Sequence, residues 1–214
     1  MSILNRLAYF QNRRDETPNQ ELARDLAVRK DRAGIREIAE NLWNKNKGIQ
    51  ADCIKVLYEI GYLEPALIAE YAEDFVNLLK SKNNRLVWGG MIALAGAAKA
   101  NPDAVFKHLD EIKKAKESGS VITVDNSIAV LANTAAANAR YNQAIFPYLL
   151  DHLKTCRPKE VAQHSEKTLP AVNTGNRDEF IKLLNKRMER LSGAGLSRVK
   201  KVIKQAQALH EPQL

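Results

Sequence analysis

The sequence has few of the residues that build disulfide scaffolds, metal centres or membrane spans. Its 214 residues include only two cysteines, Cys53 and Cys156, which is too few for a disulfide framework or a four-cysteine zinc site. No apolar run approaches the ~18 residues that predict a membrane span. The first residues also lack the apolar core of a signal peptide. We therefore expect a cytoplasmic protein with no transmembrane segment.

Motifs that carry chemistry are also nearly absent. The sequence contains no GxGxxG, GxxxxGK[ST], GxSxG or HExxH, so it predicts no phosphate loop, nucleophile elbow or zincin helix. The histidines show no paired metal-ligand spacing, and we expect no metal and no other cofactor. His152 and Cys156 are four residues apart in one predicted helix. We interpret this pair as helix packing rather than as a base and a nucleophile.

The sequence does contain an internal repeat with a period of 37 residues. One column of the repeat holds Leu57, Leu94, Leu131 and Leu169, spaced by 37, 37 and 38 residues. A second column, upstream in each unit, holds Ile35, Ala72, Leu109, Phe146 and Leu184, with the same period and the same single insertion. Columns that share one period and one insertion are typical of a repeat protein.

Each repeat carries two helical patterns. Ile35, Ile38 and Leu42 fall on one face of a first helix, and Ile54 and Leu57 fall on one face of a second helix. No segment alternates with period two, so no strands are expected. The sequence thus predicts an all-α fold, an α-solenoid of about five helix pairs with an N-terminal helical cap.

The predicted boundaries follow from the period. Residues 1–30 form the cap, residues 31–208 form the repeats, and residues 209–214 form a tail. The repeats are expected at about 31–62, 63–99, 100–139, 140–174 and 175–208, stacked into a single structural domain.

The repeats resemble those of the HEAT-repeat, or armadillo-type, family. The segment Ile49–Gly61 is similar to the second helix of a HEAT repeat, and Ala66–Leu79 with Leu86–Ala98 is similar to a complete unit. One departure is that the arginine which often follows the first apolar residue of the second helix is replaced. Its positions hold Gln50, Val87, Val124 and Ala162. The resemblance implies paired helices, but it does not imply the usual Asp–Arg ladder between units.

In stacks of this kind the second helices line the usual binding face. In the first unit, the positions of the second helix that point away from Ile54 and Leu57 are candidates for this face. The same positions in later units, found by shifting by the repeat period, predict a binding groove of Trp88, Ile92, Asp125, Asn126, Asn133, His164 and Lys167. Trp88 is either a partner anchor on this groove or a ring packed under a neighbouring helix. Gly89 and Gly90 allow close approach of an adjacent helix, with close approach of a ligand as the rival interpretation.

Positive charge gathers at the C-terminal end. Of the net charge of +8, residues 174–214 contribute +5, from nine basic and four acidic residues. Lys200, Lys201 and Lys204 form a basic end on the last predicted second helix. Such an end either is a solvated cap or attracts an anionic partner such as nucleic acid.

The groove residues and the basic end lead to two hypotheses for the function of this protein. The first is a non-enzymatic scaffold that binds a protein or peptide on its concave face. The alternative is a nucleic-acid-binding protein, because the groove is similar in kind to that of HEAT-like alkylpurine DNA glycosylases. That resemblance implies that Trp88 contacts a nucleotide, that Asp125 stabilises positive charge on the sugar, and that the lysines hold phosphates.

Overall fold

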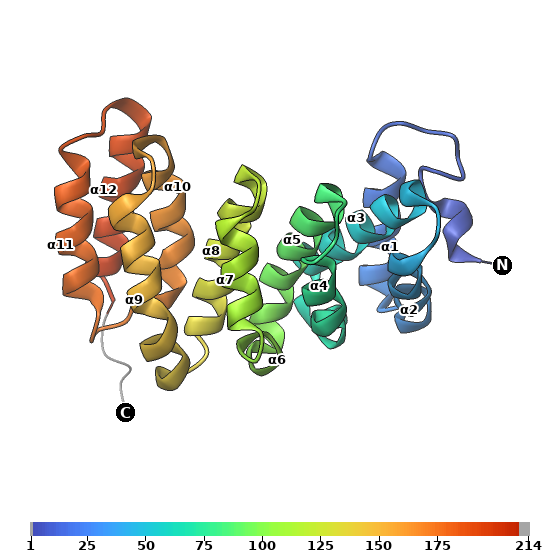
Figure 1. Cartoon of the computed structure of the whole chain (residues 1–214), viewed down its shortest axis with the longest axis horizontal. Helices are drawn as coiled ribbons and strands as arrows, with labels where there is room; N and C mark the ends of the chain where they lie inside the picture. Colours follow the sequence, from blue (N-terminus) through green and yellow to red (C-terminus); the bar gives the residue numbers. More distant parts are fainter. Residues whose placement is uncertain (1, 210–214) are drawn as a thin grey trace. The chain divides into compact units, whose positions relative to one another are not determined.

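The computed structural model describes residues 2–209, and helices dominate that range (Figure 1). Within these described residues there are twelve α-helices, five short 3-10 helices and no strand. The predicted all-α fold is therefore confirmed. Residues 210–214 of the predicted tail lie outside the described range. The division into five repeats within a single structural domain stays a prediction.

The chain forms two compact units, Met1–Val130 and Leu131–Leu214. Unit 1 contains η1 (Ile3–Arg6), α1 (Thr17–Arg29), α2 (Arg32–Glu40), η2 (Asn41–Trp43), α3 (Lys47–Leu63), η3 (Pro65–Leu67), η4 (Ala69–Tyr71), α4 (Ala72–Leu78), α5 (Asn84–Ala100), α6 (Pro102–Phe106) and α7 (Leu109–Glu117). The boundary falls within α8 (Val121–Ala135). Unit 2 then contains α9 (Ala139–Thr155), α10 (Pro158–Thr168), η5 (Leu169–Ala171), α11 (Arg177–Met188) and α12 (Gly193–Gln207).

Helix caps repeat with the period of the sequence. Asn46 and Asn83, 37 residues apart, begin α3 and α5, and their side chains accept hydrogen bonds from the backbone N–H groups of the first helical turn. Asn101 and Asn138, also 37 apart, cap α6 and α9 in the same way. A side-chain oxygen at this position satisfies a backbone donor that the helix leaves unpaired. The repeat is thus present in local structure as well as in hydrophobic pattern.

The first helix of two repeats is broken rather than continuous. Pro65 opens η3, which is followed by η4 and α4, and Pro102 opens the short helix α6 before α7. A proline in the first turn loses no helical hydrogen bond, so both starts are favourable. The second helices α3 and α5 are single, 17-residue helices. They form the continuous surface on which the candidate site lies.

Glycines let the helices of unit 1 approach closely. A Cβ atom at Gly96 of α5 would lie 3.1 Å from the Cα atom and 3.1 Å from the carbonyl oxygen of Gly61 in α3. A Cβ at Gly90 would lie 3.0 Å from the carbonyl oxygen of Phe75 in α4, and one at Gly89 would lie 2.8 Å from the Ile54 side chain of α3. The interpretation of Gly89 and Gly90 as helix-packing glycines is confirmed.

Unit 2 contains a buried polar link as well as buried apolar side chains. Phe180, Leu184, Leu149 and Leu153 are fully buried. Beside them the Asn142 amide donates to the carbonyl oxygen of Ala171 at 2.7 Å, and its oxygen accepts from Asn176 at 2.9 Å. These bonds satisfy the buried amide and tie α9 to the turn before α11. No helix within residues 2–209 is both long and apolar enough to cross a membrane.

Candidate functional site

Three aromatic side chains lie together on the second helices of unit 1. The Trp88 ring of α5 has its centroid 6.1 Å from that of Tyr58 in α3, and Tyr58 lies 6.0 Å from Tyr62, one turn further along α3. Tyr58 is buried, Trp88 is half-buried and Tyr62 is 62% exposed. Tyr58 thus supports two more accessible rings. We call these three residues, with the charged residues described next, the Trp88 face.

Four charged side chains border the rings and neutralise one another. Lys55 of α3 contacts Glu59 at 2.7 Å and Glu16 at 3.2 Å. Glu16 comes from the start of α1, and its other oxygen accepts a 2.5 Å hydrogen bond from Arg85 of α5. The Lys55 ammonium also lies 4.9 Å from the centroid of the Tyr58 ring, within cation–π range. Two cations and two carboxylates leave this face without net charge.

The surroundings raise the pKa of one ammonium group and of two phenols on this face. Burial alone would lower the pKa of Lys55, but hydrogen bonds to Glu59, Tyr58 and Glu16 outweigh it and raise that pKa. Burial raises the pKa of both Tyr58 and Tyr62. The ammonium therefore stays protonated and the phenols stay neutral. The raised pKa values of Lys55, Tyr58 and Tyr62 lie further from neutral pH than usual, which does not favour these groups as general acids or bases.

Removing the Lys55 ammonium should destabilise unit 1. In Lys55→Met the Glu16 and Glu59 carboxylates lose their shared cation, although both keep some contact with solvent. We expect a loss of about 1–2 kcal/mol in the free energy of unfolding, between the values for exposed and buried ion pairs. Urea unfolding measures this loss, and Lys99→Met on the exposed side of α5 is the matched control. Equal stability of the two variants would contradict the bridging role of Lys55.

Comparison with solved structures shows the fold. An engineered protein superposes with a TM-score of 0.66 at 17% identity, over 97% of this chain and 98% of that chain. A designed armadillo repeat protein gives a TM-score of 0.65 at 14% identity, over 95% and 98%. Another designed armadillo repeat protein, in complex with the peptide (KR)4, gives 0.66 at 14% identity, over 95% and 97%. The chain is an α-solenoid of the HEAT/armadillo type. No protein-family model and no curated protein matches its sequence.

The predicted groove residues of the solenoid differ in accessibility. Trp88 is half-buried, as are Asp125, Asn126 and Asn133 on α8 and Lys167 on α10. Ile92 is only 8% exposed and His164 is fully buried, so neither presents its side chain to solvent. The structure brings Trp88 together with Tyr58 and Tyr62, which the sequence analysis did not single out. Tyr58 and Tyr62 are four residues apart on α3, a spacing that places them on one helix face.

Unit 2 of the solenoid has two basic surfaces. Lys200, Lys201 and Lys204 are exposed on α12. A pocket lies between α9 and α11, and it is lined by Leu150, Lys154, Glu179, Lys182, Leu183, Lys186, Arg187, Glu189 and Arg190. The repeat pattern does not predict this second basic surface, because the predicted groove lies on the second helices and this pocket lies on first helices.

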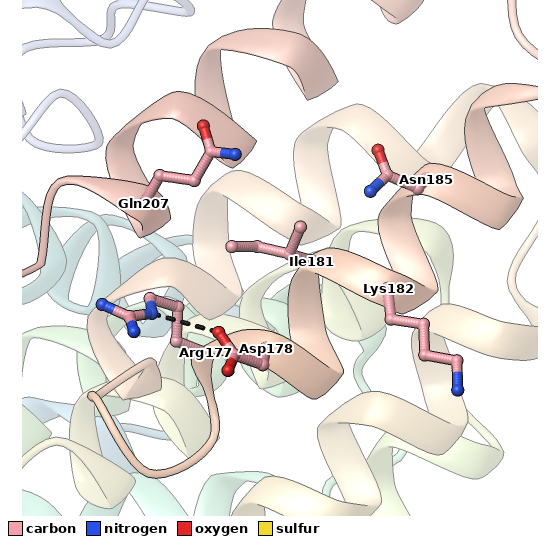
Figure 2. Close-up of a pocket in the computed structure, with 6 residues that line it drawn as sticks. All are labelled: Arg177, Asp178, Ile181, Lys182, Asn185 and Gln207. Atoms are coloured by element: carbon pink, nitrogen blue, oxygen red, sulfur yellow. Dashed lines mark hydrogen bonds and ion pairs between the residues drawn. The ribbon is translucent and has the colours of Figure 1, made fainter.

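A further pocket of unit 2 lies between α11 and the end of α12 (Figure 2). Its lining residues are Arg177, Asp178, Ile181, Lys182, Asn185 and Gln207. The Arg177 guanidinium contacts the Asp178 carboxylate at 3.3 Å and donates to the carbonyl oxygen of Leu209 at 2.9 Å. Arg177 therefore fastens Leu209, which follows α12, to α11. This structural role makes the pocket a weaker candidate site than the Trp88 face.

Proposed function

We propose that this chain is a non-enzymatic repeat scaffold that binds a protein segment or peptide on the face formed by its second helices, with Trp88 as the central anchor. The observation that carries the proposal is the half-buried Trp88 ring, held by Tyr58 and bordered by paired charges. Aromatic anchors of this kind dominate the energetics of protein interfaces. On the concave face expected for such a solenoid, they would lie at the floor of the groove.

The dimensions of the Trp88 face suit an extended segment. Because both ring centroids lie about 6 Å from that of Tyr58, the Tyr62 and Trp88 centroids are no more than about 12 Å apart. About four residues of extended peptide span this distance at ~3.3 Å per residue. The partner we propose therefore places two apolar or aromatic side chains on Trp88 and Tyr62, with polar residues beside Glu59 and Arg85.

Charge argues for a peptide rather than a nucleic acid. The two cations of the Trp88 face are Lys55 and Arg85, and both are paired with carboxylates. Backbone phosphates need unpaired cations, and their binding weakens steeply with salt. The designed armadillo protein that holds the peptide (KR)4 provides a parallel for peptide binding on this fold.

Selection from a random peptide display library tests the proposal. The library is panned on the intact chain and counter-selected on Trp88→Ala, and the binding of the enriched peptides is mapped by hydrogen exchange. We expect enriched peptides with two spaced apolar residues that protect α3 and α5. Enrichment only of peptides that bind both proteins equally would overturn the proposal. Tight duplex DNA binding that collapses between about 50 and 200 mM salt would favour the nucleic-acid alternative instead.

A further inference from the structure

Two histidines and a cysteine converge inside unit 2, where the last turn of α9 leads into α10. The Nε2 atom of His152 lies 2.9 Å from the Nδ1 atom of His164, and their ring centroids are 4.8 Å apart. The Cys156 thiol joins them, so that one ligand atom from each residue lies within 4.8 Å of the others. His164 is fully buried, Cys156 is 8% exposed and His152 is half-buried.

We propose that His152, Cys156 and His164 form a binding site for a divalent transition metal ion of the Zn²⁺ class. Imidazole nitrogen and thiolate sulfur are the ligands that such ions prefer, at about 2.0–2.1 Å for nitrogen and about 2.3 Å for sulfur. Tetrahedral coordination with these bond lengths separates the ligand atoms by about 3.3–3.6 Å. The three atoms therefore need to move by only about 1 Å to take up an ion.

The local fold holds the three residues in place. Cys156 is the C-cap residue that follows α9, and Pro158 starts α10 two residues later, so that the chain reverses and brings His164 back beside His152. Arg187 of α11 donates 2.5 Å hydrogen bonds to the carbonyl oxygens of Lys154 and Cys156 and fixes this reversal from outside. Ligands on two helices joined by a fastened turn form a preorganised site, which favours metal binding.

Metal binding at this site has a defined proton balance. The His152 Nε2 and His164 Nδ1 lone pairs would bind the ion. One of these two nitrogens carries the proton of their hydrogen bond, so metal binding breaks this bond and moves that proton to the other nitrogen of the same ring, while the second ring already holds its proton on its other nitrogen. The S–H bond of Cys156 breaks as the sulfur–metal bond forms, and its proton passes to the buffer. One water completes a four-coordinate ion with three protein ligands.

Zinc titration of the full chain, after treatment with a chelator and dialysis, tests this site. Isothermal calorimetry should give one Zn²⁺ per chain, and titrations in two buffers of different ionisation enthalpy should show proton release. Co²⁺ should produce the near-ultraviolet charge-transfer absorption of a cobalt–thiolate bond. Cys156→Ala should lose that absorption and at least about 100-fold in zinc affinity, since even outer-shell changes cost 10–100-fold. His152→Gln, at the half-buried ligand, is a second variant for the same measurements.

Matched controls come from the same chain. Cys53 is buried in α3, where burial and the nearby Asp52 and Glu37 carboxylates raise its pKa to about 12, so it remains a thiol. Cys53→Ala and His108→Gln should therefore bind zinc as the unaltered chain does. The proposal is overturned if the unaltered chain binds no Zn²⁺ at micromolar concentrations. It is also overturned if Cys156→Ala binds zinc as tightly as the control variants, or if bound Co²⁺ shows no thiolate band.

Discussion

Gly96→Val should lower the free energy of unfolding of unit 1 by about 3 kcal/mol, at the upper end of the range for overpacking a tight core. The added side chain would place its first carbon 3.1 Å from the Gly61 backbone of α3, and backbone cannot rotate away. Helices α3 and α5 would have to separate. Chemical denaturation followed by circular dichroism measures the loss.

Gly195→Ala is the matched control for this substitution. Gly195 lies in α12, and a Cβ atom built there meets nothing within 4 Å. Alanine loses less backbone entropy than glycine on folding into a helix, so this variant should be more stable by about 0.5–1 kcal/mol. A Gly96→Val protein as stable as the unaltered chain would contradict the close approach of α3 and α5.

Trp88→Ala should weaken binding of a selected peptide at least about 30-fold, because removing a hot-spot tryptophan costs about 2 kcal/mol or more. Calorimetric titration measures the change. Tyr62→Ala should weaken binding to a smaller extent, and at 62% exposure it should leave the fold intact.

The other tryptophan provides the control for this experiment. Trp43 lies in η2, is 53% exposed and is not part of the Trp88 face. Trp43→Ala should therefore leave peptide affinity unchanged. Equal losses in the two tryptophan variants would show that binding depends on general stability rather than on the Trp88 face.

The sequence predicted the helices well, because their signals are local. The 37-residue columns predict an all-α fold of paired helices, and the same spacing reappears in the caps Asn46 and Asn83. The breaks in the first helices escaped prediction, since a proline such as Pro102 is equally compatible with a short and a long helix. Gly96 also escaped notice, because its role depends on the position of Gly61 in another helix.

The candidate sites were less predictable than the fold. Trp88 is a candidate in the sequence because small or polar residues occupy the same position in the other repeats. Tyr58 lies among the apolar residues of α3, so the sequence predicts it to be a core residue. The sequence pattern predicts helix packing for His152 and Cys156 and a groove position for His164, because His164 lies on the next helix. Only the chain reversal between α9 and α10 brings His164 to the other two. Spacing along one helix carries no information about that reversal.

Tryptophan fluorescence tests the central claim most directly, because the chain contains only two tryptophans. In Trp43→Phe all tryptophan emission comes from Trp88, and in Trp88→Phe it comes from Trp43. We predict that a selected peptide shifts the Trp88 emission, with a midpoint equal to its calorimetric Kd, and leaves the Trp43 emission unchanged. Emission from Trp88 that does not respond to saturating peptide, with Trp43 responding instead, would contradict the assignment of the Trp88 face as the binding surface.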